Sequence, residues 1–283
     1  MATTKTRRPR KAATASQAQA PATAPATQAA PAATQTEQSR HAITVALPTW
    51  NNLNILWLQL ESLLRQDTQR AFEVIIHECP VSGGYPSEEL IVGYMAKFAQ
   101  RGVRVEYIRA GKRTPLVNKW RELAAHATSD NLLMVASDNY TPAKAVDAYC
   151  AAFADGYDWI DCPNGVFYDI ASRKVAEFRA PEGKTGVLFA TKTRNIRELP
   201  ASDLERNIDG YIKSHVSPES VAHLEFTDGV LTDGYNTISH HRAAKYAGLR
   251  KKPPFYETDC TLYDRLPADI AARVEKLKPI VVG

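Results

Sequence analysis

Hydrophobic and polar positions change in blocks along residues 42–137, and these blocks predict strands that alternate with helices. Short runs rich in apolar residues predict four strands, at residues 43–48, 72–77, 103–109 and 131–137. Apolar spacing and capping residues predict three intervening helices, at residues 53–66, 86–102 and 116–127. This alternation is typical of a mostly parallel central sheet with helices on both faces. The expected fold class is therefore α/β and Rossmann-like.

The pattern is less regular after residue 138. Residues 142–156 predict a helix with a proline near its start, and residues 159–180 predict two strands about a turn at Ser172. Further helices are expected at residues 202–215 and 268–277. Between them, two Thr-Asp-Gly turns precede another short predicted helix. We therefore expect one α/β domain over residues 41–283.

Polar residues follow three of the predicted strands. They are Pro48-Thr49-Trp50-Asn51, His77-Glu78 and Ser137-Asp138-Asn139. Ligands of parallel α/β sheets bind at the carboxyl ends of the strands, so these segments predict a binding rim. The sequence has no GxGxxG and no GxxxxGK[ST] loop, which argues against a dinucleotide or P-loop site. An acidic rim instead suits Mg²⁺ or Mn²⁺ bridging the protein to a nucleotide diphosphate.

The motifs resemble, in chain order, those of inverting GT-A glycosyltransferases of family 2. ITVALPTWNN resembles the first strand and turn of that family, FEVIIHE its second strand, and VNKWRELAAHATSDNLLMVASDN the stretch that ends in its DxD motif. NTISHHRAAKYAG resembles the segment preceding the acceptor site, and ETDCTLYDRL resembles EDxxLxxRL. The matches cover about residues 42–270. The DxD motif is degenerate here, with Asp138 as its one carboxylate.

The resemblance implies transfer of a sugar, with inversion, from a nucleotide-sugar donor to an acceptor hydroxyl. Together with the basic loop at residues 111–115 it implies donor-binding residues Pro48, Thr49, Asn51, Glu78, Lys112, Arg113, Asn118, Ser137 and Asp138. Asp138 would hold a divalent metal on the diphosphate, with His240 as an additional ligand. Asp259 would be the general base, and Glu257 nearby would raise its pKa.

Each of these residues also has a structural interpretation. Asp138 and Glu78 would then cap the turns that follow them. Asp259 would be a solvated or capping acid, and Lys112 and Arg113 would lie in a solvated loop. His240 would belong to the surface or the core. The reduced DxD motif leaves room for a GT-A-like transferase of a non-sugar group. A catalytically silent domain that binds nucleic acid or acts as a scaffold is a further alternative.

Residues 1–40 differ in composition from the rest of the chain. They contain no Val, Leu, Ile, Phe, Tyr or Trp, so we expect this segment to be disordered. Six Lys and Arg residues against Glu37 give it a net charge of +5. The whole chain carries +4, so the domain is close to −1. The segment suits a solubilising extension or contact with phosphates, whereas the lack of an apolar face argues against an organelle transit peptide.

The remaining composition bears on compartment and partners. Four widely spaced cysteines without a CxxC pair argue against a zinc knuckle and fit a reducing compartment. No apolar run is long enough to span a membrane, so we expect a cytoplasmic protein, in the host cytoplasm if the chain is viral. The basic segment makes DNA a candidate acceptor, through a hydroxymethylated base of the kind that phages glycosylate.

Overall fold

The computed structural model describes residues 41–278 except 82–83, 171–172, 182–187, 201–207 and 234–254. The chain divides into two units, Met1–Gln38 and Ser39–Gly283, and the description below concerns the second.

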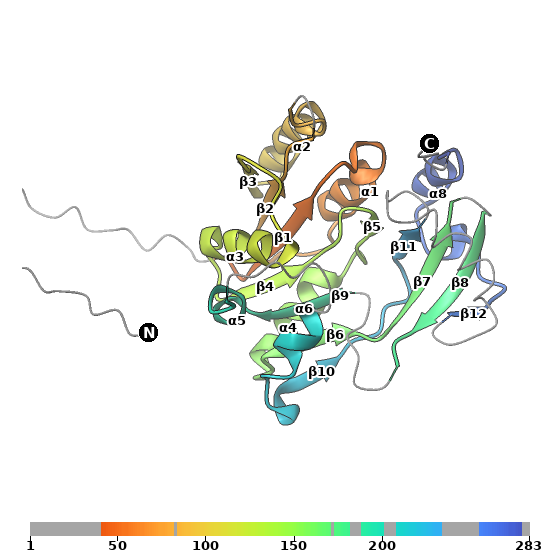
Figure 1. The fold of residues 1–283 in the computed structure, drawn as a ribbon. Coiled ribbons are helices and arrows are strands. Elements are labelled where there is room, and N and C mark those ends of the chain that lie inside the picture. Colours follow the sequence, from red (N-terminus) through yellow and green to blue (C-terminus); the bar gives the residue numbers. More distant parts are fainter. Residues whose placement is uncertain are drawn as a thin grey trace, which may run out of the picture. The chain divides into compact units, whose positions relative to one another are not determined.

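The main sheet has seven strands in the order β10-β6-β9-β4-β1-β2-β3 (Figure 1). They are β1 (Ile43–Thr49), β2 (Phe72–Glu78), β3 (Arg104–Arg109), β4 (Asn131–Met134), β6 (Trp159–Cys162), β9 (Leu188–Lys192) and β10 (Val221–His223). Neighbouring strands are parallel, except that β9 runs antiparallel to β4 and β6. The predicted mostly parallel α/β sheet is confirmed.

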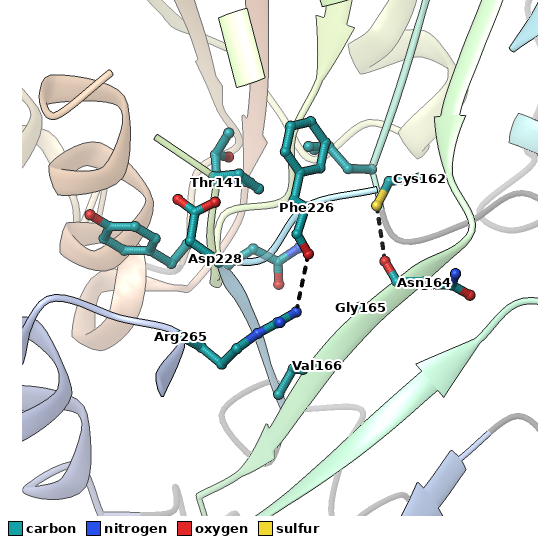
Figure 2. A pocket seen from close by; sticks show the side chains of 13 residues that line it. Thr141, Cys162, Asn164, Gly165, Val166, Phe226, Asp228 and Arg265 are labelled. Carbon is teal, nitrogen blue, oxygen red and sulfur yellow. Dashed lines mark hydrogen bonds between the residues drawn. The ribbon is translucent and has the colours of Figure 1, made fainter. Parts of the chain in front are cut away.

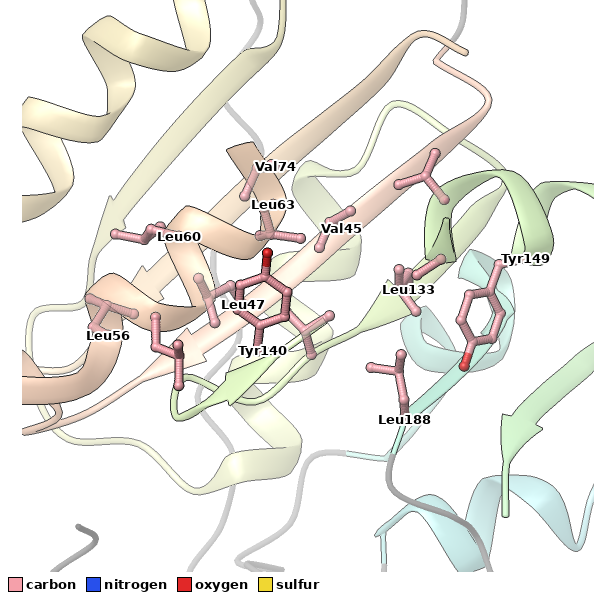
Figure 3. Close-up of a cluster of buried hydrophobic side chains, with 14 of the residues drawn as sticks. Val45, Leu47, Leu56, Leu60, Leu63, Val74, Leu133, Tyr140, Tyr149 and Leu188 are labelled. Atoms are coloured by element: carbon pink, nitrogen blue, oxygen red, sulfur yellow. The ribbon is translucent and has the colours of Figure 1, made fainter. Parts of the chain in front are cut away.

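Helices cover both faces of this sheet because side chains alternate along each strand. Val45 and Leu47 of β1 pack with buried residues of α1 and α4 (Figure 3), whereas Ala46 packs with α3 on the other face. The helices are α1 (Leu53–Leu64), α2 (Glu88–Gln100), α3 (Leu116–His126), α4 (Ala145–Ala154), α5 (Thr193–Arg197), α6 (Ile208–Lys213) and α8 (Ala268–Glu275). Short 3₁₀ turns lie at η1 (Pro218–Ser220) and η2 (Leu262–Asp264).

A second, five-stranded sheet has the order β12-β8-β7-β11-β5. Its strands are β5 (Asn139–Tyr140), β7 (Asn164–Asp169), β8 (Lys174–Arg179), β11 (Val230–Asp233) and β12 (Phe255–Glu257). Residues 159–180 therefore form three strands and not the predicted two. Pro163 separates β6 from β7, so the chain leaves the main sheet there and enters the second.

Several predicted boundaries need correction. The strand predicted to reach residue 137 ends at Met134, because the residues after it turn out of the main sheet toward β5. The helix predicted over 86–102 spans Glu88–Gln100. The helix predicted over 202–215 is described as Ile208–Lys213. The helix expected after the Thr-Asp-Gly turns falls within 234–254, outside the described residues.

Candidate functional site

The carboxyl ends of three parallel strands meet at one edge of the main sheet. Thr49 of β1 is in register with Glu78 of β2, and Glu78 is in register with Arg109 of β3. On the other side of β1, Ala46 is in register with Met134, so the chain beyond β4 carries Ser137 to the level of Thr49. The structure thus brings together the predicted segments after β1, β2 and β4.

The loop after β1 is held against the segment after β4. Asn51 has φ +54°, a left-handed conformation that asparagine tolerates better than most residues. This turn precedes Asn52, whose Nδ2 donates to Ser137 Oγ at 2.5 Å. Pro48 and Thr49 form the end of β1, and the buried Oγ1 of Thr49 has no hydrogen-bond partner within the described part of the chain. The sequence did not indicate a site role for Asn52, because an asparagine directly before a helix is usually an ordinary N-cap.

The basic loop after β3 lies beside the loop after β1. The guanidinium of Arg113 stacks 4.0 Å from the ring centroid of Trp50, and Lys112 next to it is exposed. Asn118 lies in the first turn of α3, which begins directly after this loop, and is partly buried. Two cationic side chains and an aromatic ring therefore border the rim, an arrangement that suits a negatively charged ligand.

Glu78 has a structural role in this site. Its carboxylate is fully buried, and it accepts hydrogen bonds from the Ser87 amide at 3.0 Å and from the Tyr107 hydroxyl. Burial and the Glu78 carboxylate together hold the pKa of Tyr107 well above its usual range. Both carboxylate oxygens thus have partners inside the protein. The carboxylate has further acceptor capacity but is fully buried, so a contact with a nucleotide base would require its surroundings to open, and it stays a prediction.

A buried thiol follows Glu78. Burial alone raises the pKa of Cys79, but the neighbouring His77 imidazole, Thr114 and the charge of Lys119 outweigh burial and lower it to about 7. The ring of His77 is held by Glu122, with 2.9 Å between Nε2 and Oε2. A histidine-associated thiol directly after Glu78 is a feature that the spacing of the four cysteines did not indicate.

Asp138 lies between buried Ser137 and buried Asn139 and is itself partly exposed. No cluster of three or more His, Cys, Asp or Glu side chains suited to a metal occurs in the described part of the chain. His240, the second predicted ligand, lies outside the described residues, as does the basic segment within residues 1–40. One carboxylate still fits a magnesium-type ion, because Mg²⁺ is usually held by one or two carboxylates together with substrate phosphates and water.

Asp259 and Glu257 lie away from this rim, contrary to the expectation that they converge with Asp138. Glu257 belongs to β12, at one edge of the second sheet, and Asn139 belongs to β5, at the other edge (Figure 1). The register aligns Asn139, Leu231, Phe167, Ala176 and Glu257 in one row. Four strand spacings of ~4.8 Å separate the ends of that row by about 19 Å. Asp259, two residues beyond β12, is exposed.

The strand register brings a different acid toward Asp138. Antiparallel pairing aligns Val230 with Tyr140 and Leu231 with Asn139, so β11 continues from this pairing in the direction of the chain segment before β5, and its last residue is Asp233. Asp233 is also in register with Asp169, the last residue of β7. Sequence reasoning read Thr232-Asp233-Gly234 as a turn, because Asp-Gly is a strong turn signal. Long-range strand pairing was needed to place it.

A pocket borders β5, and both residues of that strand, Asn139 and Tyr140, line it (Figure 2). Its walls are mainly apolar, with Val166 and Phe226 among them, and its ionisable lining residues, among those described, are Tyr140, Cys162, Asp228 and Arg265. Asp228 accepts from the Ala143 amide at 2.7 Å, and Arg265 Nη2 donates to the Phe226 carbonyl at 3.4 Å. The first bond holds the 226–229 loop to the segment that follows β5, and the second holds it to the residue after η2, so Asp228 and Arg265 already have structural functions.

Comparison with known proteins shows likeness at the level of fold. No family model matches the sequence, and no curated protein matches it in sequence. The structure is similar to Staphylococcus aureus TarS 1–349 in complex with UDP-GlcNAc, with a TM-score of 0.52 and 13% identity over 68% of this chain. The fold is GT-A-like.

The same protein in complex with UDP gives a TM-score of 0.51 at 12% identity, over 82% of this chain and 69% of TarS 1–349. A mannosyltransferase from Pyrobaculum calidifontis, in complex with GDP-Man and Mn²⁺, gives a lower TM-score of 0.48 at 16% identity, over 72% of this chain and 60% of that chain. The match to the UDP-GlcNAc complex spans 58% of TarS 1–349, less than two thirds of its length. At such identities the likeness establishes the fold alone.

Among the described residues, no helix is long and apolar enough to cross a membrane.

Proposed function

We propose that this protein is a glycosyltransferase that moves a sugar from a nucleotide-sugar donor to an acceptor hydroxyl with inversion at the anomeric carbon. One observation supports it most directly: on a GT-A-like fold, the loops after β1, β3 and β4 form a continuous polar rim. Trp50 and Arg113 stack at one side of that rim, and the bonded pair Asn52 and Ser137 leads to Asp138 at the other. Proteins of this fold include one in complex with UDP-GlcNAc.

The rim suggests how the donor would lie. The diphosphate would contact Lys112 and Arg113, because a guanidinium can donate two parallel hydrogen bonds to phosphate oxygens. Thr49 and Asn51 would line the approach to the nucleoside, and Asn118 would bind from the start of α3. Asp138 would hold Mg²⁺ or Mn²⁺ on the diphosphate, with His240 as the further predicted ligand; such an ion neutralises charge that develops on the leaving group.

The acceptor step requires a base opposite the leaving group. The acceptor oxygen attacks the anomeric carbon, the bond from that carbon to the diphosphate oxygen breaks, and the acceptor proton passes to a carboxylate. We assign Asp233 as the first candidate for this base, because strand pairing carries it toward Asp138. Asp259, with Glu257 beside it, is the second candidate, suggested by sequence resemblance.

A nucleotide-sugar screen tests the proposal. Melting temperature should rise with one class of nucleotide sugar, more so with Mn²⁺, and Asp138→Asn should abolish the metal-dependent part. Released nucleoside diphosphate should then be measured with candidate acceptors. Asp233→Asn should lower kcat by roughly 10²- to 10⁴-fold, as expected for loss of a general base. Asp155→Asn, an exposed acid at the end of α4, is the matched control and should change neither quantity.

The outcomes separate the alternatives. Full activity of Asp233→Asn together with loss of activity in Asp259→Asn would move the base to the residue suggested by the sequence. Release of a sugar phosphate instead of nucleoside diphosphate would indicate that the nucleotidyl group, and not the sugar, is transferred. Absence of stabilisation by any nucleotide, combined with tight DNA binding, would favour the catalytically silent domain and overturn the proposal.

A further inference from the structure

A buried acid outside the donor rim holds two basic side chains. Asp161 of β6 and His223 of β10 are cross-strand neighbours in a parallel pair, so their side chains lie on the same face of the sheet. His223 Nδ1 lies 2.5 Å from one carboxylate oxygen of Asp161. The other oxygen accepts from Lys213 Nζ at 2.7 Å and from Trp159 Nε1 at 3.1 Å. Asp161 is fully buried.

The three ionisable groups differ in exposure. The side chain of His223 is 54% exposed and that of Lys213 is 14% exposed, whereas that of Asp161 is 0% exposed. The acid is therefore hidden beneath the two bases and unavailable to a ligand. A structural role for the cluster, tying α6 and β10 to the sheet, explains the bond between Lys213 and Asp161. It does not require a histidine that is oriented by a buried carboxylate and still half exposed.

Lys213 and His223 line a surface groove of about 580 Å³. The other described residues of its wall are uncharged, and three of them are prolines: Pro163, Pro181 and Pro218. Lys213 and His223 are thus the ionisable residues of this described lining, and both are basic. A groove with rigid apolar walls and two directed basic groups suits an anion whose remaining part is weakly polar.

The groove lies at the same edge of the sheet as the donor rim. β6 and β10 run parallel to β4, because β9 between them is antiparallel to both β4 and β6. The carboxyl ends of β6 and β10 therefore lie on the edge that carries Asp138. In the strand order, β10 is three strands from β4, about 14 Å at ~4.8 Å per strand. A ligand in the groove lies within the reach of an extended acceptor.

From these observations we propose that the Lys213–His223 groove binds a phosphoryl group carried by the acceptor. That the phosphoryl group belongs to a sugar acceptor rests on the proposed glycosyl transfer, but the anion site itself can be tested without turnover. Neutral His223 donates from Nδ1 to Asp161, and the protonated ring also has Nε2–H to donate to a phosphate oxygen. Lys213 adds a charged donor on the other side of the same carboxylate.

Binding of inorganic phosphate to the full chain, measured by calorimetry, is the first test. His223→Gln and Lys213→Gln should each weaken phosphate binding at least tenfold, whereas Lys213→Arg should retain most of it. His215→Gln is the matched control, because His215 is an exposed histidine just beyond α6 that does not line the groove; it should bind phosphate like the wild type. Thermal melts establish that each variant is folded. Because His223 is half exposed, its substitution should disturb folding less than substitution of Lys213.

A sugar phosphate and a short single-stranded DNA then distinguish a phosphomonoester from a phosphodiester acceptor. Equal phosphate affinity in the wild type, His223→Gln and Lys213→Gln would overturn the proposal, and so would a wild type that binds no phosphate. Measurements of donor binding distinguish failure of this proposal from failure of the proposed function. His223→Gln should leave stabilisation by nucleotide sugar unchanged, and Asp138→Asn should leave phosphate binding unchanged. A wild type that no nucleotide sugar stabilises would overturn the transferase proposal but not the anion site.

Discussion

Gly229 shows how one residue positions the segment between the two sheets. Its φ of +88° lies in the left-handed region that favours glycine. A Cβ at this position would lie 2.9 Å from Pro142 Cγ and 2.9 Å from the Tyr140 carbonyl oxygen. The Gly229 amide also donates to the Arg265 carbonyl at 2.9 Å. The close approach of this loop to β5 therefore depends on the absence of a side chain, and β11, which carries Asp233, begins at the next residue.

Gly229→Ala should destabilise the protein by about 2–4 kcal/mol, since a strained backbone and an overpacked contact each cost about 1–3 kcal/mol. Gly93→Ala is the matched control. Gly93 lies in α2 with open space around it, and alanine there should stabilise the protein by up to about 1 kcal/mol. Urea unfolding of both variants gives the comparison. A Gly229→Ala protein as stable as the wild type would show that the loop can move away from β5.

At the scale of secondary-structure elements, α8 is attached to α1 by two different kinds of contact. Ile270, Ala271 and Val274 of α8 are buried in the core that also includes α1. At the surface, Arg65 contacts Asp269 with 2.7 Å between Nη2 and Oδ2, and the guanidinium of Arg273 lies 3.6 Å from the ring centroid of Trp57. Exposed ion pairs contribute little to stability, so the apolar contacts should account for most of the attachment.

Ile270→Ala should lower the free energy of unfolding by about 2–4 kcal/mol, because it removes buried methylene groups and leaves a cavity. Asp269→Asn, one residue earlier, should have a much smaller effect. Val92→Ala serves as the apolar control: Val92 is 53% exposed on α2, and its truncation should change stability by less than about 0.5 kcal/mol. Denaturant midpoints rank the three variants, and a larger loss in Asp269→Asn than in Ile270→Ala would contradict this account.

At the scale of the whole molecule, charge is distributed unevenly along the chain. The first 40 residues carry a net charge of +5, and the whole chain carries +4, so the remaining residues carry a net charge of about −1. The two halves of the proposed chemistry are therefore separable in principle. The polar rim and the Lys213–His223 groove belong to residues 41–278, whereas we expect any non-specific attraction to a polyanion to come from the basic segment.

Deletion of residues 1–40 should leave the stabilisation by nucleotide sugar unchanged and should reduce DNA retention at low salt by at least tenfold. The reason is that counterion release scales with the number of cations that contact phosphates, and six Lys and Arg residues are removed. Electrophoretic mobility shifts over a salt series measure the retention. Undiminished DNA binding by the shortened chain would assign the interaction to the folded domain and remove the basis for the DNA-acceptor hypothesis.

Much of the fold could be predicted because its signals are local. Apolar runs and helical spacing between residues 43 and 134 identified four parallel strands and three helices with boundaries within about three residues. The short strands β5, β9, β10, β11 and β12 were missed. Their few residues carry no period of their own, and pairing with distant strands defines them.

By itself, the sequence determined the α/β alternation and the polar segments that follow β1, β2 and β4, since hydrophobic period and strand ends are properties of neighbouring residues. The tertiary structure decided where the acidic side chains lie relative to these polar segments. Glu78 became a buried hydrogen-bond acceptor, Asp259 was placed across the second sheet from Asp138, and Asp161 was paired with His223, 62 residues later. Such pairings depend on strand order and register, which arise from contacts between distant parts of the chain and leave no local pattern.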